Sequence, residues 1–247
     1  MQKFRVQGDV VRALAVFVAA SLVLWLLRAF VCQVYNVESA HPAVPFLYGD
    51  RVVVTKTDYG MRLPSCVPGQ CCRLGSGSPQ RGDMIAFNIP SSPGFLGGNV
   101  TLARCMALPG DTVYIDAKYG VSLRKTAGAC PFAVPAKDTP VEVTRWNARL
   151  LCNAMNLHEP CHYAETAGDT LMLDGHPVRY VVFSQDYYWA YSGKQSNRGD
   201  SRCYGFVPMN HIIGKARFVA WSVEPGAPIR HCLRRGRFFM NLKTAGK

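Results

Sequence analysis

Acidic residues are scarce in this sequence, with 16 Asp and Glu against 28 Lys and Arg, so the net charge is +12. Such an imbalance favours an anionic partner, either a nucleic acid or a lipid surface. No recognised nucleic-acid-binding module accompanies the charge, so we expect no nucleic-acid partner. Extended disorder is also excluded over most of the 247 residues, because 49% of them are hydrophobic.

A regular zinc-binding signature is missing as well. The cluster "CVPGQCC", with Cys66, Cys71 and Cys72, lacks the paired C-x-x-C spacing of a zinc site, so we predict no metal and no cofactor. The 10 cysteines are many for a cytosolic enzyme and fit an oxidising compartment. Cys152 and Cys161 are candidates for a disulfide bridge, although some thiols are equally consistent with small buried apolar residues.

One long apolar run is present, at residues 13–32 ("ALAVFVAASLVLWLLRAFVC"), and Arg28 is its single charge. A run of about 20 apolar residues is long enough to cross a membrane. Lys3, Arg5 and Arg12 precede it, so the positive-inside rule places the N-terminus in the cytoplasm. We therefore predict a single-pass anchor in the inner or cytoplasmic membrane, with the main domain on the periplasmic or outer face. A cleaved signal peptide is the alternative, because "VAAS" offers small residues; the apolar run continues past it, which favours an anchor.

Amphipathic helices are rare after this run, and short apolar runs between turn residues predominate. We expect strands within residues 50–60 and 84–89, a Pro-Gly-Asp turn between two runs in 100–115, and an Asp-Gly hairpin in 169–183. Residues 205–224 predict a closing strand pair, and residues 63–83 and 90–99 predict loops. One helix is predicted over residues 144–159, with Trp146, Leu150 and Met155 on its apolar face.

These patterns predict a mainly β domain at residues 33–224, between the anchor and a basic C-terminal tail at 225–247. The cytoplasmic N-terminus would be residues 1–12. In the tail, basic residues alternate with bulky apolar ones in "IRHCLRRGRFFMNLKTAGK". This alternation suits a segment lying on anionic lipid, and a solvated disordered tail is the alternative.

Several segments occur in an order that resembles one enzyme family. After the N-terminal span come "SAHPAVPFLYGDRVVVTKTDYG", "RGDMIAFNIP", "ARCMALPGDTVYI" and "GDSRCYGFVPMNHIIGKARFVAWS". Together they resemble the type I signal peptidases, serine–lysine proteases that remove signal peptides from exported proteins. The resemblance implies a signal-peptidase-type antiparallel β-sheet domain on the outer membrane face, with signal peptides or preproteins as partners. The substrate would add as an extended strand beside the active serine.

The resemblance also implies a serine nucleophile, a second hydroxyl in the oxyanion hole and a neutral lysine whose pKa is lowered by burial. The family turn reads Ser-x-Ser-Met-x-Pro before a Gly-Asp pair. Counting back from Gly49 and Asp50 without gaps puts Ser39 on the oxyanion serine and His41 on the nucleophile. A two-residue insertion would instead make Ser39 the nucleophile. In both alignments Ser39 is the candidate hydroxyl of this turn.

The lysine position is changed in either alignment. The family reads Lys-Arg-x-x-x-Leu-Pro-Gly-Asp, and this chain has Ala103 at the lysine, followed by Arg104 and, at the end of the motif, Asp111. A methyl group takes no proton, and the guanidinium of Arg104 stays charged and accepts none. We assign Arg104 and Asp111 structural positions near the site.

The third motif is changed too. In "SGKQSNRGDSR", Arg198 stands where the family has the serine that orients the lysine. Asp200, Ser201 and Arg202 are kept, and we expect a structural carboxylate–guanidinium pair there.

Two functional hypotheses follow from these changes. The first is a non-catalytic homologue that binds signal peptides, preproteins or an active paralogue. The second is an active serine endopeptidase with Ser39 as nucleophile and a base other than lysine.

Other polar residues have simpler interpretations. His41 is a candidate base for Ser39, although a polar surface histidine is the simpler interpretation. We expect Lys56 to be structural, Lys194 to be solvated and Cys105 to be a buried thiol rather than a nucleophile.

Overall fold

The computed structural model describes residues 2–37, 45–63, 72–90, 99–118, 120–159, 162–192, 200–227 and 232–242. The helices are α1 (Gln2–Leu26), the π-helical η1 (Leu27–Val31), α2 (Ala148–His158), α3 (Ser201–Tyr204) and the 3₁₀ turns η2 (Met209–His211) and η3 (Arg235–Arg237). The strands are β1 (Cys32–Asn36), β2 (Asp50–Thr55), β3 (Met61–Leu63), β4 (Cys72–Leu74), β5 (Met84–Asn88), β6 (Val100–Ala107), β7 (Thr112–Ile115), β8 (Val121–Ser122), β9 (Cys130–Ala133), β10 (Val141–Glu142), β11 (Ala164–Ala167), β12 (Thr170–Leu173), β13 (His176–Val178), β14 (Tyr180–Val181), β15 (Tyr187–Tyr191), β16 (Val207–Pro208), β17 (Ile212–Ser222) and β18 (Met240–Asn241). The prediction of a mainly β chain with an apolar N-terminal helix is confirmed.

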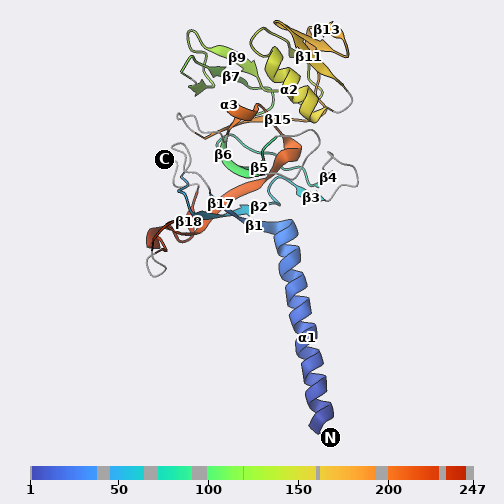
Figure 1. Ribbon diagram of the computed structural model, residues 1–247, viewed down its shortest axis with the longest axis vertical. Coiled ribbons are helices and arrows are strands. Elements are labelled where there is room, and N and C mark those ends of the chain that lie inside the picture. The colour runs from blue at the N-terminus through green and yellow to red at the C-terminus, as the bar shows by residue number, and fades with distance from the viewer. Residues whose placement is uncertain are drawn as a thin grey trace.

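The N-terminal helix projects away from the β domain (Figure 1). Within it, Arg12–Val31 has a mean hydropathy of 2.4 and none of it is buried against the protein, so its length and composition suit a membrane span. Helix α1 begins before the predicted span, and Cys32 belongs to strand β1. At the junction, the Lys56 ammonium donates to the carbonyls of Arg28 (3.0 Å) and Ala29 (3.1 Å). These carbonyls lie near the end of the helix, where main-chain oxygens lack helical donors.

The main sheet is antiparallel, with strand order β1-β2-β17-β5-β6-β15-β16, and β18 pairs with β17. Strand β5 is buried at every residue, which fits its place in the middle of the sheet. Its side chains alternate between two faces. Ile85 and Phe87 join one apolar cluster, and Met84 and Ala86 join the other. The sheet therefore has a core on both faces.

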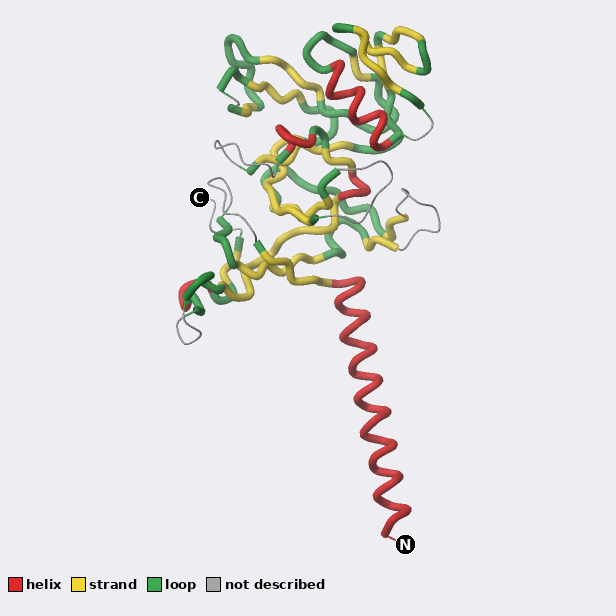
Figure 2. Tube along the Cα trace, viewed as in Figure 1, coloured by secondary structure: helices red, strands yellow, loops and turns green. Residues whose placement is uncertain are grey.

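A second group of small sheets lies on the side of the main sheet away from α1 (Figure 2). It contains the sheets β8-β7-β9, β11-β12-β13 and β10-β14 together with α2, around a separate apolar core. The predicted Asp-Gly hairpin is the β12–β13 turn, where Asp174 (φ 50°) and Gly175 (φ 82°) both adopt the positive φ of a type I′ turn.

Helix α2 confirms the predicted helix and two of the three residues predicted on its apolar face, because Met155 is buried and Leu150 packs against the same core. Trp146 precedes the helix and is 47% exposed, whereas Leu151, Cys152 and Met155 are buried. The indole instead stacks under the Arg145 guanidinium. Cys152 is a free thiol whose Sγ lies 3.3 Å from the carbonyl of Ala164, and Cys161, its candidate disulfide partner, lies outside the described residues.

Three further predictions from local pattern differ from the structure. The predicted loop at 63–83 contains β4, which pairs with β3. The strands within 205–224 are not partners, because β16 pairs with β15 while β17 pairs with β2 and β5. Residues 232–242 of the predicted C-terminal tail pack on the domain, because β18 pairs with β17 and Leu242 is buried.

Candidate functional site

The strands that carry the motifs place three side chains in one row across the main sheet. Lys215 of β17 lies opposite Ile85 of β5, and Ile85 lies opposite Ala103 of β6. Residues directly opposite each other in an antiparallel pair project from the same face. The site predicted around Ala103 therefore faces the same side of the sheet as Lys215.

Ala103 is fully buried in apolar surroundings. It is 0% exposed and belongs to a cluster with Tyr59, Ile85, Cys105 and Tyr188. The apolar packing is of the kind that would lower the pKa of a buried lysine. At this position, however, the chain has only a methyl group.

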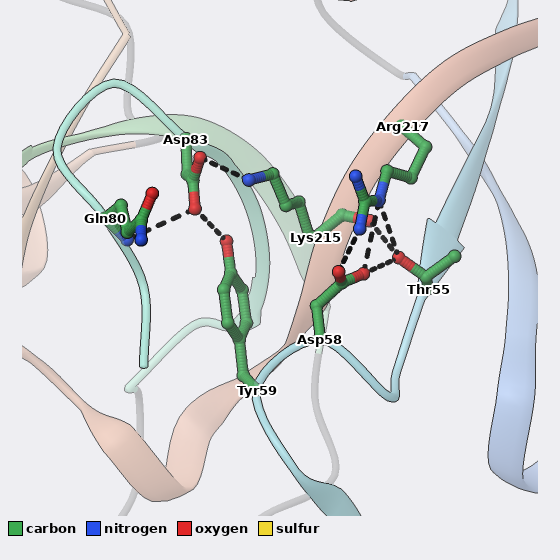
Figure 3. A network of polar contacts seen from close by, with 7 residues as sticks. All are labelled: Thr55, Asp58, Tyr59, Gln80, Asp83, Lys215 and Arg217. Carbon is green, nitrogen blue, oxygen red and sulfur yellow. Dashed lines mark hydrogen bonds and ion pairs between the residues drawn. The ribbon is translucent and has the colours of Figure 1, made fainter. Parts of the chain in front are cut away.

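Next to this cluster, Asp83 accepts three hydrogen bonds (Figure 3). They come from Lys215 (2.5 Å), the Tyr59 hydroxyl (2.8 Å) and the Gln80 amide (3.1 Å). Burial raises the pKa of Asp83, but the hydrogen bonds from Lys215, Tyr59 and Gln80 and the charge of Lys215 outweigh it, so the pKa is lowered overall. Burial and the bond to Asp83 raise the pKa of Tyr59.

Among the described residues, Lys215 is the lysine that the strand register places on the same face of the main sheet as Ala103. As an ammonium bound to Asp83, it has no lone pair to accept a proton. It also lies two strands from Ala103, about 10 Å at the usual strand spacing. This geometry makes Lys215 a partner of Asp83 rather than a base at the Ala103 position.

A second ion pair lies beside the first (Figure 3). The Arg217 guanidinium bonds to the Asp58 carboxylate, and Asp58 also accepts a hydrogen bond from the Thr55 hydroxyl. Arg217 and Lys215 are two residues apart on β17, and the register of β17 against β2 shifts at Arg217, between Ala216 and Phe218. Together the two pairs join β17 to the segments that follow β2 and precede β5.

Arg104 and Asp111 lie on either side of the β6–β7 connection. The Nε of Arg104 is buried and has no hydrogen-bond partner among the residues that the structure describes. Asp111 accepts from the amide of Leu108 (2.7 Å) and from the Arg81 guanidinium (2.7 Å). Asp111 therefore holds the Leu-Pro-Gly-Asp turn closed, and its place in the predicted site stays a prediction.

The Asp200–Arg202 ion pair is present and buried. Their side chains are 1% and 6% exposed, and Arg202 Nη2 lies 2.6 Å from Asp200 Oδ2. Asp200 also accepts from the amide (3.2 Å) and hydroxyl (2.9 Å) of Ser192. The hydroxyl of Ser201 accepts from the amide of Ala190 (2.9 Å). These contacts fasten α3 to the end of β15.

Seven residues singled out from the sequence lie outside the described residues: Ser39, His41, Cys66, Cys71, Cys161, Lys194 and Arg198. Residues 38–44 connect described Val37, which follows β1, to Pro45, which precedes β2. The roles assigned to Ser39 and His41 therefore stay predictions.

Cys105 does not have the properties of a nucleophile. It is 0% exposed, and burial, with the charges of Asp83 and Asp111, raises the pKa of its thiol to about 12. A thiol rather than a thiolate is therefore expected near neutral pH. Among the described residues, no group of three or more His, Cys, Asp or Glu side chains could hold a metal ion.

Sequence reasoning missed Asp83, Tyr59 and Lys215 as a group. A signal existed, because Lys215 interrupts the apolar run "IIGKARFVAW" and a charge in a buried strand needs a partner. The sequence does not indicate which acid that partner is, since Asp83 is distant along the chain. Only the β5–β17 pairing brings the two together.

Comparison with known proteins identifies the same family that the order of the motifs indicated. The sequence profile of the family described as "Signal peptidase, peptidase S26" matches residues 10–221. Signal peptidase I of Aquifex aeolicus is 26% identical over 225 residues, which cover 81% of this chain and 80% of that protein. Signal peptidase I of Pseudomonas aeruginosa is 25% identical over 224 residues, covering 85% and 71%. The chain therefore belongs to the signal peptidase family, peptidase S26.

Proposed function

We propose that this chain is a membrane-anchored, non-catalytic member of the family that recognises signal peptides or preproteins in protein export. The observation that supports it most directly is Ala103, a fully buried methyl group among apolar side chains. The family resemblance assigns the general base to this position. Without a base, serine catalysis loses most of its rate, and what remains comes from binding and the oxyanion hole.

The surroundings of Ala103 give no replacement base among the described residues. Lys215 is bound to Asp83, and Cys105 is a buried thiol. In the ungapped alignment His41 also replaces the nucleophile, and Arg198 replaces the serine that would orient the lysine. An active peptidase with Ser39 as nucleophile and a non-lysine base is the competing proposal.

A cleavage assay on a preprotein separates the two proposals. Purified full-length protein in detergent is compared with its Ser39→Ala variant, and a fluorescent signal peptide is titrated in parallel. The non-catalytic proposal expects no cleavage by either protein and saturable peptide binding. Cleavage that disappears in Ser39→Ala would support the active peptidase, and absence of both cleavage and binding would rule out both proposals.

The membrane arrangement is a further part of the proposal. We place the N-terminus in the cytoplasm and the β domain on the outer face of the cytoplasmic membrane, because basic residues precede the span. Trp221 (39%), Phe238 (43%) and Phe239 (74%) are exposed on segments near the strands from which α1 leaves (Figure 1). Exposed rings on basic segments suit contact with anionic lipid.

Fluorescence quenching by brominated lipid tests this contact. In proteoliposomes of a Trp25→Phe variant, which keeps Trp146, Trp189 and Trp221, brominated anionic lipid should quench part of the tryptophan emission. Trp221→Phe or Phe239→Ser in this background should reduce the quenched part. Equal quenching with and without Trp221 would rule out the lipid contact. An active paralogue as partner is a separate proposal, tested by co-purification from cells that express both proteins.

A further inference from the structure

Several polar side chains meet at the end of the membrane helix, where η1 leads into β1. The Lys56 ammonium, which follows β2, donates to the carbonyls of Arg28 (3.0 Å) and Ala29 (3.1 Å). Strand β3, which contains Arg62, lies against η1. Tyr35 belongs to β1, and the charges of Arg62 and Arg28 both act on its hydroxyl. Together, Arg28, Tyr35, Lys56 and Arg62 form what we term the junction site.

The junction site concentrates positive charge. Burial lowers the pKa of the Lys56 ammonium, and the charges of Arg62 and Arg28 lower it further. Like charges this close to one another repel. Burial raises the pKa of Tyr35, so its hydroxyl keeps its proton and can donate a hydrogen bond. An anion placed among these groups would reduce the repulsion and accept from the phenol.

The cations of the junction site differ from other partly buried cations of the chain in their partners. Lys215, for example, is matched by the carboxylate of Asp83. By contrast, neither Arg28 nor Lys56 forms an ion pair with a carboxylate of the described residues. An ammonium has three donors, and the two helix carbonyls accept from two of those on Lys56. Its third N–H therefore has no acceptor in the part of the chain that the structure describes.

The position of the junction site along the membrane span indicates which anion it meets. The span suited to a membrane is Arg12–Val31, so Arg28 lies about 5 Å along the helix axis from its end. Strands β1 and β2 continue directly from this end (Figure 1). Cationic side chains at the end of a span reach the headgroup level of the bilayer. Beside the site, Leu26 (41%), Leu27 (44%) and Val31 (37%) are exposed. A phospholipid matches both features, because its phosphate is anionic and its acyl chains can cover the apolar side chains.

We propose that the junction site binds the phosphate of an anionic phospholipid at the end of α1 that meets the β domain. The proposal rests on the membrane arrangement within the proposed function, and it adds a specific lipid site to the contact expected at the exposed aromatic rings. The guanidinium of Arg28 offers paired donors to two phosphate oxygens, and Arg62 and Tyr35 add a charge and a hydroxyl. Lys56 links the bound headgroup to the helix, because the same ammonium donates to the helix carbonyls. The lipid would thereby brace α1 against the β domain.

Native mass spectrometry of the full-length protein in detergent measures the binding. Phosphatidylglycerol is titrated into the unaltered protein, Arg28→Gln, Lys56→Met and the control Lys125→Met, which changes an exposed lysine between β8 and β9. The proposal expects the most tightly bound lipid to be held about tenfold more weakly by Arg28→Gln and Lys56→Met than by Lys125→Met. Lys56→Arg should restore part of the affinity, because it keeps the charge. Phosphatidylcholine, whose headgroup has no net charge, should bind the unaltered protein more weakly.

Equal affinities in Arg28→Gln, Lys56→Met and Lys125→Met would overturn the proposal, and so would an equal loss in all three, which indicates general attraction between opposite charges. If Lys56→Met unfolds, Arg28→Gln decides, because the Arg28 side chain is exposed. Inorganic phosphate in large excess should not displace the lipid, because it has no acyl chains; displacement would assign the site to free phosphate instead. Phe239→Ser should leave this lipid bound, and its loss would place the lipid at the aromatic rings.

The lipid site and the proposed function can fail separately. If the full-length protein does not sediment with liposomes, the membrane arrangement and the lipid site are both wrong. If it sediments but Arg28→Gln and Lys56→Met bind the lipid as Lys125→Met does, the lipid site alone is wrong. Neither measurement depends on signal-peptide binding or on cleavage.

Discussion

Replacing Arg202 with methionine should lower the stability of the β domain substantially, because it leaves the Asp200 carboxylate buried without its cation. The two side chains are 6% and 1% exposed, so water does not replace the lost partner. Removing one member of a buried pair typically costs about 3–5 kcal/mol. Asp200 keeps the Ser192 amide and hydroxyl and the Arg202 amide as donors, which favours the lower end of that range.

A second contact adds to this cost. The Arg202 guanidinium lies over the Tyr191 ring, 4.9 Å from its centre. Such a cation–π contact contributes roughly 0.5–1 kcal/mol. The sum is about 3.5–4 kcal/mol. For a chain of this size, roughly 2–4 °C per kcal/mol gives a decrease in melting temperature of about 7–16 °C.

The assay is thermal unfolding in detergent, followed by circular dichroism, for a double-mutant cycle. Asp200→Asn with Arg202→Met removes both charges, so it should cost less than Arg202→Met alone. Arg124→Met changes an exposed arginine elsewhere and should leave the melting temperature within about 2 °C, since surface changes are usually small. A loss below about 1 kcal/mol in Arg202→Met, or strict additivity in the cycle, would refute the reasoning.

Three further predictions concern the site and its neighbours. The double variant His41→Ser with Ala103→Lys should cleave a preprotein that the unaltered chain leaves intact. Overpacking at the buried Ala103 position should lower the free energy of unfolding by about 1–3 kcal/mol, measured by thermal unfolding. If the double variant does not cleave the preprotein, the assignment of these positions is wrong. Burial lowers the pKa of His158 to about 3, so the folded protein holds this side chain in its neutral form. The free energy of unfolding should therefore fall as the pH falls from 6.5 towards 3, and it should fall less steeply in His158→Gln. If the free energy of unfolding depends on pH in the same way in both proteins, the prediction is wrong. Iodoacetamide should label the exposed Cys203 in the native protein and the buried Cys105 only after unfolding. Mass spectrometry of the labelled peptides measures both reactions. Labelling of Cys105 in the native protein would contradict the burial of its thiol.

The motif order was predictable from sequence because it depends on residue identity and spacing. Ala103 carries no base in any fold, and the match over residues 10–221 confirms the family that the motifs indicated. The roles of Ser39 and His41 remain predictions. The prediction of a separate C-terminal tail was made from basic residues alternating with apolar ones, a pattern equally compatible with a segment that packs on the domain.

Local pattern was sufficient where neighbours along the chain determine the structure. It predicted the apolar N-terminal helix, α2 and the Asp174–Gly175 hairpin, because helix periodicity and turn chemistry act over a few residues. It failed for Trp146, which precedes α2 and is exposed. Which side of a short helix is covered depends on the small sheets packed around it, and these come from distant segments.

By itself, the sequence determined that this chain has an apolar N-terminal helix, a mainly β domain and an alanine at position 103, which carries no base in any fold. The tertiary structure alone decided how the buried charges are matched. Lys215 pairs with Asp83, and Arg237 with Asp50, across large separations in sequence. A charge in an apolar run must find a partner when it is buried, but strand register and chain packing choose that partner, and neither is encoded in the local pattern.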